Sequence, residues 1–436
     1  MPWSGSAGPV PRLVLRPLQA FLHTEEAGGI LLLVAAVTAL IWANSPWRGS
    51  YDAFWHTELT LRLGGWSLSE DLRHWVNDAL MTLFFLVVGL EIKRELRTGE
   101  LREPRAAVLP AIAALGGMVV PALLYLAINP SGEAARGWGI PMATDIAFAL
   151  GVLAIVGRGL PAALRSYLLA LAIVDDIGAI LVIAVFYAGT IAVGALLAAG
   201  GLLALILVLQ LLHVRWAVVY VALGVGVWLA TLESGIHATI AGVALGLATP
   251  AVAFQRPKAV SLEAHRVADQ TVDHPVPPDA DAHHWLHLAR LSREAVSPLA
   301  RLEQLLHPWT SYAVIPVFAL ANAGVAIGGS SLADAVTSGV TLGIVAGLVV
   351  GKTVGVTVFT WMATRIGITL LPEGVRWSQL IGVAALAGIG FTVSLFITGL
   401  AFQTESGQEA AKVGILAASL LAGLLGALLL ARTQRR

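Results

Sequence analysis

The sequence contains no cysteine, and few of its residues carry a charge. Without cysteine the chain has neither a disulfide framework nor a thiolate metal site. Only 12% of its 436 residues are Asp, Glu, Lys or Arg, whereas soluble domains carry roughly 25%. Basic and acidic residues number 27 each, so the formal net charge is zero. This balance gives no indication of a nucleic-acid partner.

Apolar residues fill most of what remains. They make up 57% of the chain, and the mean hydropathy is +0.80. Twelve apolar segments are long enough to cross a bilayer as helices. They cover residues 21–43, 75–95, 105–128, 138–157, 164–188, 191–212, 215–232, 236–253, 304–327, 339–362, 377–402 and 408–431. The sequence therefore predicts an all-α polytopic membrane protein: a membrane domain at 21–431 between short tails at 1–20 and 432–436.

The basic residues indicate how these spans are oriented. With the N-terminus in the cytoplasm, cytoplasmic segments hold 21 of the 27 Lys and Arg residues and outer segments hold 4. The other two, Lys352 and Lys412, lie within spans. Basic residues favour the cytoplasmic side of a membrane. We therefore expect both termini to be cytoplasmic and the number of spans to be even.

Two connections are longer than the others. Residues 254–302 are polar and contain HPVPPDADAHHW, so we expect a mobile cytoplasmic linker there. Residues 57–69 read TELTLRLGGWSLS, in which leucines alternate with polar residues on both sides of Gly64-Gly65. This pattern predicts a β-hairpin with a two-residue turn on the outer face. An isolated hairpin is marginally stable in water, so pairing with a second copy is a plausible reason to keep one.

The stretch LAIVDDIGAI (171–180) places Asp175 and Asp176 side by side in an apolar run, with no basic residue within nine positions. Ionisable groups at membrane depth are costly and mark functional sites by default. Two close carboxylates titrate as a coupled pair and also supply the oxygen ligands that hard cations prefer. The site can therefore hold a proton or a small cation. A structural role, in which the aspartates cap a broken helix or bind a lysine, is the alternative.

A single lysine lies near the middle of another span. Lys352 occurs in VVGKTVGV (349–356). Pairing with Asp175 or Asp176 would offset the cost of burying both charges. A proton or a cation at the carboxylate would break that pair. The alternative is an ion pair that only stabilises the fold.

Two spans contain helix breakers in similar settings. In GIPMATDIAFALG (139–151), Thr144 and Asp145 follow a glycine and a proline, and in AALAGIGFTVSLF (384–396), Gly388 and Gly390 interrupt the pattern. Paired interruptions of this kind predict broken helices at a transport site. Asp145 could then neutralise positive half-helix ends, and Lys352 negative ones. Glycine used only for close helix packing is the alternative.

Other ionisable residues lie at the ends of spans. Glu91, Lys93, Arg94 and Glu95 occur where a span reaches the cytoplasm, and a salt-bridged interface is the simplest interpretation. Such a cluster could also respond to cytoplasmic pH. Glu303 and His307 lie four positions apart near the same face. His237 lies near the outer surface, and histidine titrates near neutrality.

Seven stretches carry a resemblance that covers nearly the whole chain. They are NDALMTLFFLVVGLEIKREL, GGMVVPALLYLAIN, ATDIAFALG, LAIVDDIGAI, ESGIHATIAG, LHPWTSYAVIPVFALANAG and GIGFTVSLF, in this order. Together they resemble the NhaA family of bacterial Na+/H+ antiporters. The resemblance implies electrogenic exchange of Na+ or Li+ for protons across the inner membrane, switched on by alkaline pH. It also implies a transporter without a cofactor, rather than an enzyme, in the lipid bilayer.

The resemblance further implies a fold and residue roles. The fold has twelve helices, with two inverted three-helix repeats and two broken helices that cross. Asp176 is implied as the principal carboxylate for cation and proton, with Asp175 paired to Lys352. The implied cation site comprises Asp175, Asp176, Thr144 and Asp145, and Asp145 belongs to the helix that crosses the one containing Gly388 and Gly390. The implied pH-response residues are Glu91, Arg94, Glu95, Glu303 and His307, and we add His237. The hairpin at 57–69 is implied as the contact of a homodimer.

Two departures from the family pattern stand near these residues. The family often has proline after the membrane lysine, where this chain has Thr353. A second histidine often follows the acid of the pH cluster, where this chain has Gln304.

Two other functional classes fit membrane carboxylates. An intramembrane aspartyl protease would need carboxylates from separate helices to face one water, as Asp145 and Asp176 could. The GxGD setting of such proteases is absent from the sequence. An acid-lined cation channel would conduct cations without coupling to protons.

Overall fold

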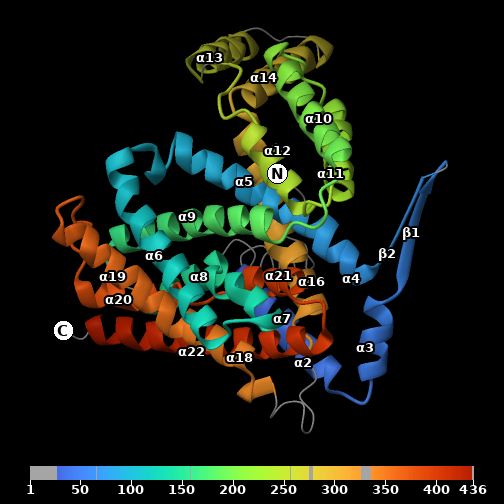
Figure 1. The fold of residues 1–436 in the computed structure, drawn as a ribbon. Coiled ribbons are helices and arrows are strands. Elements are labelled where there is room, and N and C mark those ends of the chain that lie inside the picture. The colour runs from blue at the N-terminus through green and yellow to red at the C-terminus, as the bar shows by residue number, and fades with distance from the viewer. Residues whose placement is uncertain are drawn as a thin grey trace.

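The structure is a computed structural model that describes residues 27–64, 66–157, 159–255, 257–273, 278–325 and 335–434. The predicted tail at 1–20 lies outside these residues. So do residues 435 and 436 of the predicted tail at 432–436, while its first three residues continue the last helix. Helices dominate the described chain, and one small sheet stands apart from them (Figure 1).

Six helices in the described part of the chain are long and apolar enough to cross a membrane. They are the continuous α4–η3–α5 (Leu72–Trp75, Val76–Leu80 and Met81–Arg97), α6 (Pro104–Ile128), α9 (Ala162–Phe186), α10 (Val193–Leu211), the continuous α18–η7–α19 (Gly339–Val345, Ala346–Gly351 and Lys352–Arg365) and α22 (Glu405–Gln434). Many apolar side chains on their outer surfaces are exposed, such as Leu197 and Leu211 of α10. That distribution suits helices surrounded by lipid.

Three bent pairs raise the count of spans to nine, among the residues described. They are α2 with α3 (Ala27–Ala43 and Arg48–Trp55), α7–η5 with α8 (Gly132–Ala135, Arg136–Met142 and Ile146–Val156), and α20 with α21 (Trp377–Leu386 and Phe391–Ala401). The second and third pairs bend by 47° and 45°. These breaks fall at the two interruptions that the glycine and proline pattern predicts.

The remaining predicted spans fall on shorter helical elements. They are α11 (Ala217–Glu233), α12 (Thr239–Ala248) and the continuous α15–η6–α16 (Pro298–Trp309, Thr310–Val314 and Ile315–Asn322). With the helices above, they account for all twelve predicted apolar segments. A short 3₁₀ turn, η4 (Glu100–Arg102), joins α5 to α6.

Small residues let some helices touch through their backbones. A Cβ atom added at Gly89 of α5 would lie 2.7 Å from the Val243 carbonyl oxygen and 3.2 Å from the Gly246 Cα of α12. Lys93 then donates a hydrogen bond from Nζ to the Leu247 carbonyl, 2.5 Å away. Small residues at such contacts are the usual way in which membrane helices approach closely. The packing joins the C-terminal end of α5 to the end of α12.

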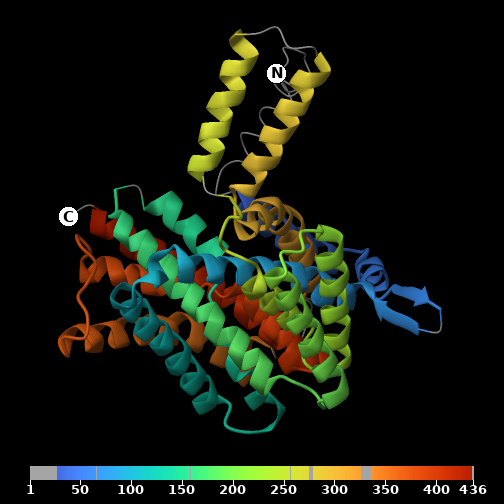
Figure 2. The ribbon, with the colours of Figure 1, turned by 90° about the horizontal axis from the view of Figure 1, so that it is seen from above.

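The predicted β-hairpin at 57–69 is confirmed. Strands β1 (Glu58–Leu63) and β2 (Trp66–Asp71) pair antiparallel, and the closing pair Leu63 and Trp66 leaves two residues for the turn. Leu59 and Leu61 are exposed. The hairpin extends away from the helices in a second view (Figure 2). Leucine side chains of β1 thus remain exposed in the described part of the chain.

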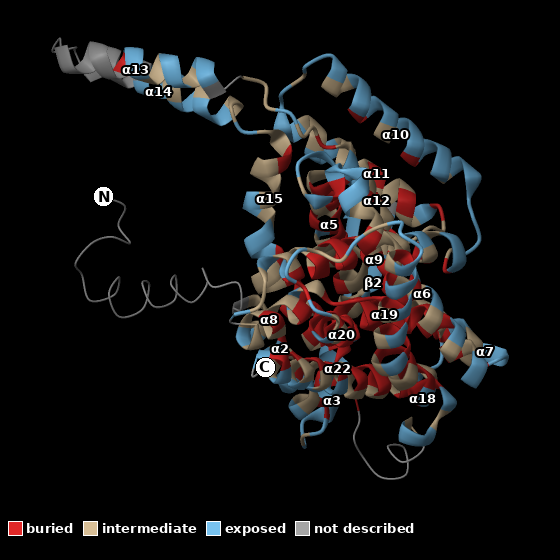
Figure 3. Cartoon of the chain, turned by 90° about the vertical axis from the view of Figure 1, so that its left-hand side faces the viewer, coloured by how far each residue is buried: buried red, intermediate tan, exposed pale blue. Residues whose placement is uncertain are grey.

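The expectation of a linker at 254–302 is wrong for most of its length. Residues Pro257–Asp273 form α13 and Pro278–Glu294 form α14. The two helices pack together into a helical hairpin that projects from the membrane domain (Figure 3). Both segments begin with proline and contain three alanines each, and these residues favour helix at such positions. The polar composition therefore reflects a solvated helical pair.

Candidate functional site

The two broken helices meet at their breaks. The backbone N–H of Asp145 donates to the Ile389 carbonyl oxygen, 2.6 Å away, between α8 and α21. The Ser394 hydroxyl donates to the Ile140 carbonyl at 2.8 Å. Backbone carbonyls at each break thus accept hydrogen bonds from the other broken helix. In a membrane interior such groups need partners within the protein.

Asp145 neutralises two helix N-termini. Its Oδ1 accepts from the Phe148 backbone N–H at 3.1 Å and so caps α8. Its Oδ2 accepts from the backbone N–H and the hydroxyl of Thr392, at 3.1 and 2.7 Å, at the start of α21. Both helix ends carry partial positive charge, which a carboxylate compensates.

Lys352 provides the opposite charge, on the other side of the same break. Its Nζ lies 2.5 Å from Asp175 Oδ2 and donates a second hydrogen bond to the Met142 carbonyl oxygen at the end of η5. Lys352 and Asp175 are both fully buried. The ammonium therefore meets a carboxylate and the negative end of a half-helix at once.

Thr144 connects the ion pair to the second break. Its Oγ1 lies 2.7 Å from Asp175 Oδ2 and 2.7 Å from the Ala387 carbonyl oxygen at the end of α20. A hydroxyl has one proton, so it donates to only one of these oxygens at a time. Thr144 thus connects the Asp175 carboxylate to the break between α20 and α21.

Asp176 is the least compensated member of the group. It is 5% exposed, and its Oδ1 is buried without a hydrogen-bond partner. Asp175 Oδ1 is also buried without one. Neighbouring residues on a helix point about 100° apart, so Lys352 pairs with Asp175 Oδ2, whereas no ion pair reaches Asp176 from the described residues. Buried oxygens without partners need a proton, a cation or water.

The described residues contain no group of three or more acidic, histidine or cysteine side chains able to hold a metal ion. A cation at the aspartates would therefore draw part of its oxygen shell from hydroxyls, backbone carbonyls or water. Na+ and Li+ accept such neutral oxygens as hard cations do.

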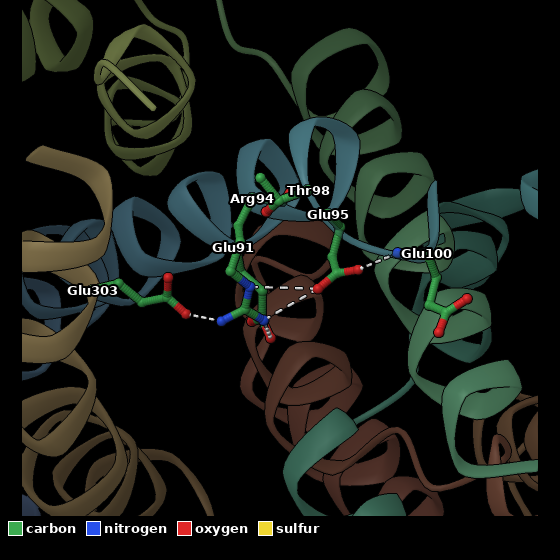
Figure 4. Close-up of polar contacts among 6 residues, drawn as sticks. All are labelled: Glu91, Arg94, Glu95, Thr98, Glu100 and Glu303. Carbon is green, nitrogen blue, oxygen red and sulfur yellow. Dashed lines mark hydrogen bonds and ion pairs between the residues drawn. The ribbon is translucent and has the colours of Figure 1, made fainter. Parts of the chain in front are cut away.

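Three acidic side chains gather around one arginine (Figure 4). Arg94 lies 3.5 Å from Glu91 and 3.3 Å from Glu95 on α5, and it forms an ion pair with Glu303 on α15. Glu95 Oε2 also accepts from the Glu100 backbone N–H at 3.0 Å. Three carboxylates share one half-exposed guanidinium, so protonation of any one changes the balance of the others.

Among the described residues, neither predicted histidine pairs with this group. His307 is exposed, one helical turn beyond Glu303. His237 precedes α12, and its Nε2 lies 2.9 Å from the Tyr187 carbonyl. His237 thus lies before the start of α12, whereas the Leu247 carbonyl that Lys93 contacts lies near the end of that helix. Burial lowers the pKa of the His237 imidazole, and the bond to Tyr187 opposes this shift.

Two backbone carbonyls that bind site residues could not be predicted from the sequence. The carbonyls of Met142 and Ala387 bind through backbone atoms, which residue types do not reveal. Tyr167 and Thr360 form a fully enclosed hydroxyl pair 2.9 Å apart between α9 and α19. For this pair, the sequence offered one indication, which was a hydroxyl-bearing residue within each of the two apolar runs.

Comparison with known proteins identifies the family of this chain. Residues 19–430 match the family described as Na+/H+ antiporter 1. "Na(+)/H(+) antiporter NhaA 2" of Sorangium cellulosum is 48% identical over 418 residues, which cover 95% of this chain and 89% of that protein. "Na(+)/H(+) antiporter NhaA" of a Janthinobacterium species is 47% identical, covering 94% and 91%. "Na(+)/H(+) antiporter NhaA 2" of Syntrophotalea carbinolica is 46% identical, covering 97% of both chains. Since these matches extend along nearly its whole length, the chain belongs to the Na+/H+ antiporter 1 family.

Proposed function

We propose that this chain is an electrogenic secondary antiporter. It exchanges Na+ or Li+ for protons across the bacterial inner membrane, under control of pH, and serves sodium and pH homeostasis. The observation that carries the proposal is the buried carboxylate of Asp176, which has no hydrogen bond or ion pair from the described residues and lies beside the Lys352–Asp175 ion pair. Such a carboxylate needs a ligand, and the relatives named above are antiporters.

Asp176 is the carboxylate that carries the exchange. A proton on its carboxylate and a cation against it each satisfy the buried oxygen, and each disfavours the other. A cation that arrives therefore displaces a proton. Asp145 and Thr144 belong to the same constellation, in which Asp145 keeps the helix ends neutral and Thr144 offers a hydroxyl oxygen.

Lys352 supplies the second proton. A cation near Asp175 and Asp176 repels the Lys352 ammonium. The cation also attracts the Asp175 carboxylate, which otherwise stabilises that ammonium. Lys352 then releases a proton, so two protons leave as one Na+ binds. When the cation departs on the other side, both groups take up protons again. Each cycle moves one net charge, which makes the exchange electrogenic.

The crossing of the broken helices lets the site face either side. Its half-helix ends are balanced by Asp145 and Lys352, so the crossing does not depend on water for stability. Rigid-body rocking of the helices around it would then expose Asp176 to one face at a time.

Regulation and assembly use other parts of the chain. We assign the pH response to the group of Glu91, Arg94, Glu95 and Glu303, whose shared ion pairs weaken as carboxylates gain protons. The hairpin at 57–69 is proposed as the contact of a homodimer, because no further strand among the described residues pairs with the outer edges of β1 and β2.

The alternatives have less support. A protease would need Asp145 to face Asp176 across one water, but both Asp145 oxygens accept hydrogen bonds from helix ends. A channel would pass cations without moving protons. The test uses everted membrane vesicles with an imposed pH gradient. Na+ or Li+ should dissipate part of the gradient at alkaline pH, and a gradient that neither ion affects from about pH 6 to pH 9 would exclude an antiporter.

A further inference from the structure

The helical hairpin of α13 and α14 is not used by the exchange site. It stands clear of the membrane domain, and its two helices pack against each other (Figures 2 and 3). Five of the eleven histidines of the chain lie between residues 265 and 287. Histidine-rich segments are typical of metal binding.

We propose that His283 and His287 on α14 bind a divalent transition-metal ion, of the class of Zn2+, Ni2+ and Cu2+. They lie four positions apart on one helix, so they are about 40° apart around it and about 6 Å apart along it. Two histidines at this spacing share a helix face and can bind one ion. Both side chains are exposed.

Both imidazoles are available to a ligand. In the described part of the chain, neither has a hydrogen-bond or ion-pair partner. The other described histidine of the hairpin, His265, differs because its Nδ1 lies 2.7 Å from the Ser261 carbonyl oxygen. The nearby acid on α13, Glu263, is paired with Arg266 at 3.5 Å.

The donor set decides the class of ion. Imidazole nitrogen suits zinc, nickel and copper, whereas Na+, Mg2+ and Ca2+ prefer oxygen. No third protein ligand joins the pair among the described residues. The ion therefore keeps water in its other positions, which makes the site distinct from the oxygen site at Asp176 and independent of the exchange.

The test is calorimetric titration of the purified full-length chain, without a histidine tag, at pH about 7.5, where imidazole is mostly neutral. One Zn2+ per chain should bind, and Mg2+ should not. His283→Gln and His287→Gln should each weaken binding at least tenfold, since even loss of an outer partner costs about 10–100-fold. His265→Gln is the matched control on the same hairpin and should bind as the native chain does.

A gain-of-function variant makes the test stricter. Arg290 lies seven positions after His283, on the same face. Arg290→His should add a third imidazole and tighten zinc binding. X-ray absorption should show zinc–nitrogen distances of about 2.0–2.1 Å. Zinc binding absent up to about 1 mM, or unchanged in the double variant of His283 and His287, would overturn the site.

Discussion

Thr392 donates two hydrogen bonds to Asp145 Oδ2, from its backbone N–H at 3.1 Å and its hydroxyl at 2.7 Å, although 247 positions separate the two residues. The same carboxylate caps α8 through Phe148. One side chain therefore holds the starts of two half-helices together at the centre of the candidate site.

This relationship predicts a loss of stability when the threonine hydroxyl is removed. Thr392→Val keeps the shape but leaves Asp145 Oδ2 with one donor fewer. Because hydrogen bonds to charged groups contribute about 1.5–3 kcal/mol, the free energy of unfolding should fall by that amount. Thermal unfolding in detergent measures it. Thr392→Ser keeps the hydroxyl and serves as control, so equal losses in the two variants would contradict the assigned bond.

Asp176→Asn should abolish Na+/H+ exchange in everted vesicles. The amide can neither release a proton nor offer the charge that a cation needs. The variant should still insert and fold, because Asp176 Oδ1 has no partner to lose. Asp52→Asn, at an exposed outer carboxylate, is the control and should exchange normally. Exchange retained at Asp176→Asn would move the carrier role to another residue.

Lys352→Met should lower the free energy of unfolding more than any other single change at the site. It leaves Asp175 buried and unpaired, and breaking one partner of a buried pair costs about 3–5 kcal/mol. Adding Asp175→Asn removes the unpaired charge and should recover part of the loss. Thermal unfolding of the two single variants and the double variant measures this coupling. Strictly additive losses would mean that the two groups do not interact.

The pH response should depend on Glu303 and not on His237. Glu303→Gln removes an ion-pair partner of Arg94. It should shift the midpoint of the pH–activity curve by up to roughly 0.7 units, because such pairs contribute about 0.2–1 kcal/mol and 1.36 kcal/mol corresponds to one unit. Exchange measured across the pH range tests this, and an unmoved midpoint would remove Glu303 from the response.

The direction in which His237 changes stability with pH follows from its lowered pKa. The folded chain binds the His237 proton less readily than the unfolded chain does, so the imidazole is neutral above its usual pKa of about 6.5 and contributes nothing there. Below that pH its burial costs stability. His237→Gln should therefore leave the alkaline activity midpoint unchanged and raise stability in acid. A shifted alkaline midpoint in this variant would return His237 to the pH response.

Removal of residues 57–69 should weaken the proposed dimer. The deletion removes the exposed strands, and with them the main-chain groups that could pair with a second copy. Mass measurement in detergent should show a larger monomer fraction, while vesicles should retain exchange. A dimer fraction equal to that of the native chain would place the contact elsewhere.

Much of this could be predicted from the order of residues. The long apolar helices follow from the length of the apolar runs, and the two breaks follow from Gly388, Gly390 and the Gly-Pro run before Thr144. The two-residue turn follows from the alternation around Gly64-Gly65. The helices α13 and α14 were missed because their polar composition resembles that of a linker, although their helix-forming residues were visible.

The sequence by itself determined which charges lie at membrane depth, because a buried Asp or Lys is evident in any apolar run. Residue patterns alone left open which aspartate meets Lys352, although the family resemblance implied Asp175, and they did not separate a structural ion pair from a transport site. The tertiary structure decided that Lys352 reaches Asp175, that Asp176 keeps a free oxygen and that Asp145 serves two helix ends. These contacts join helices far apart along the chain, and their distances depend on how whole helices pack and where their backbones break.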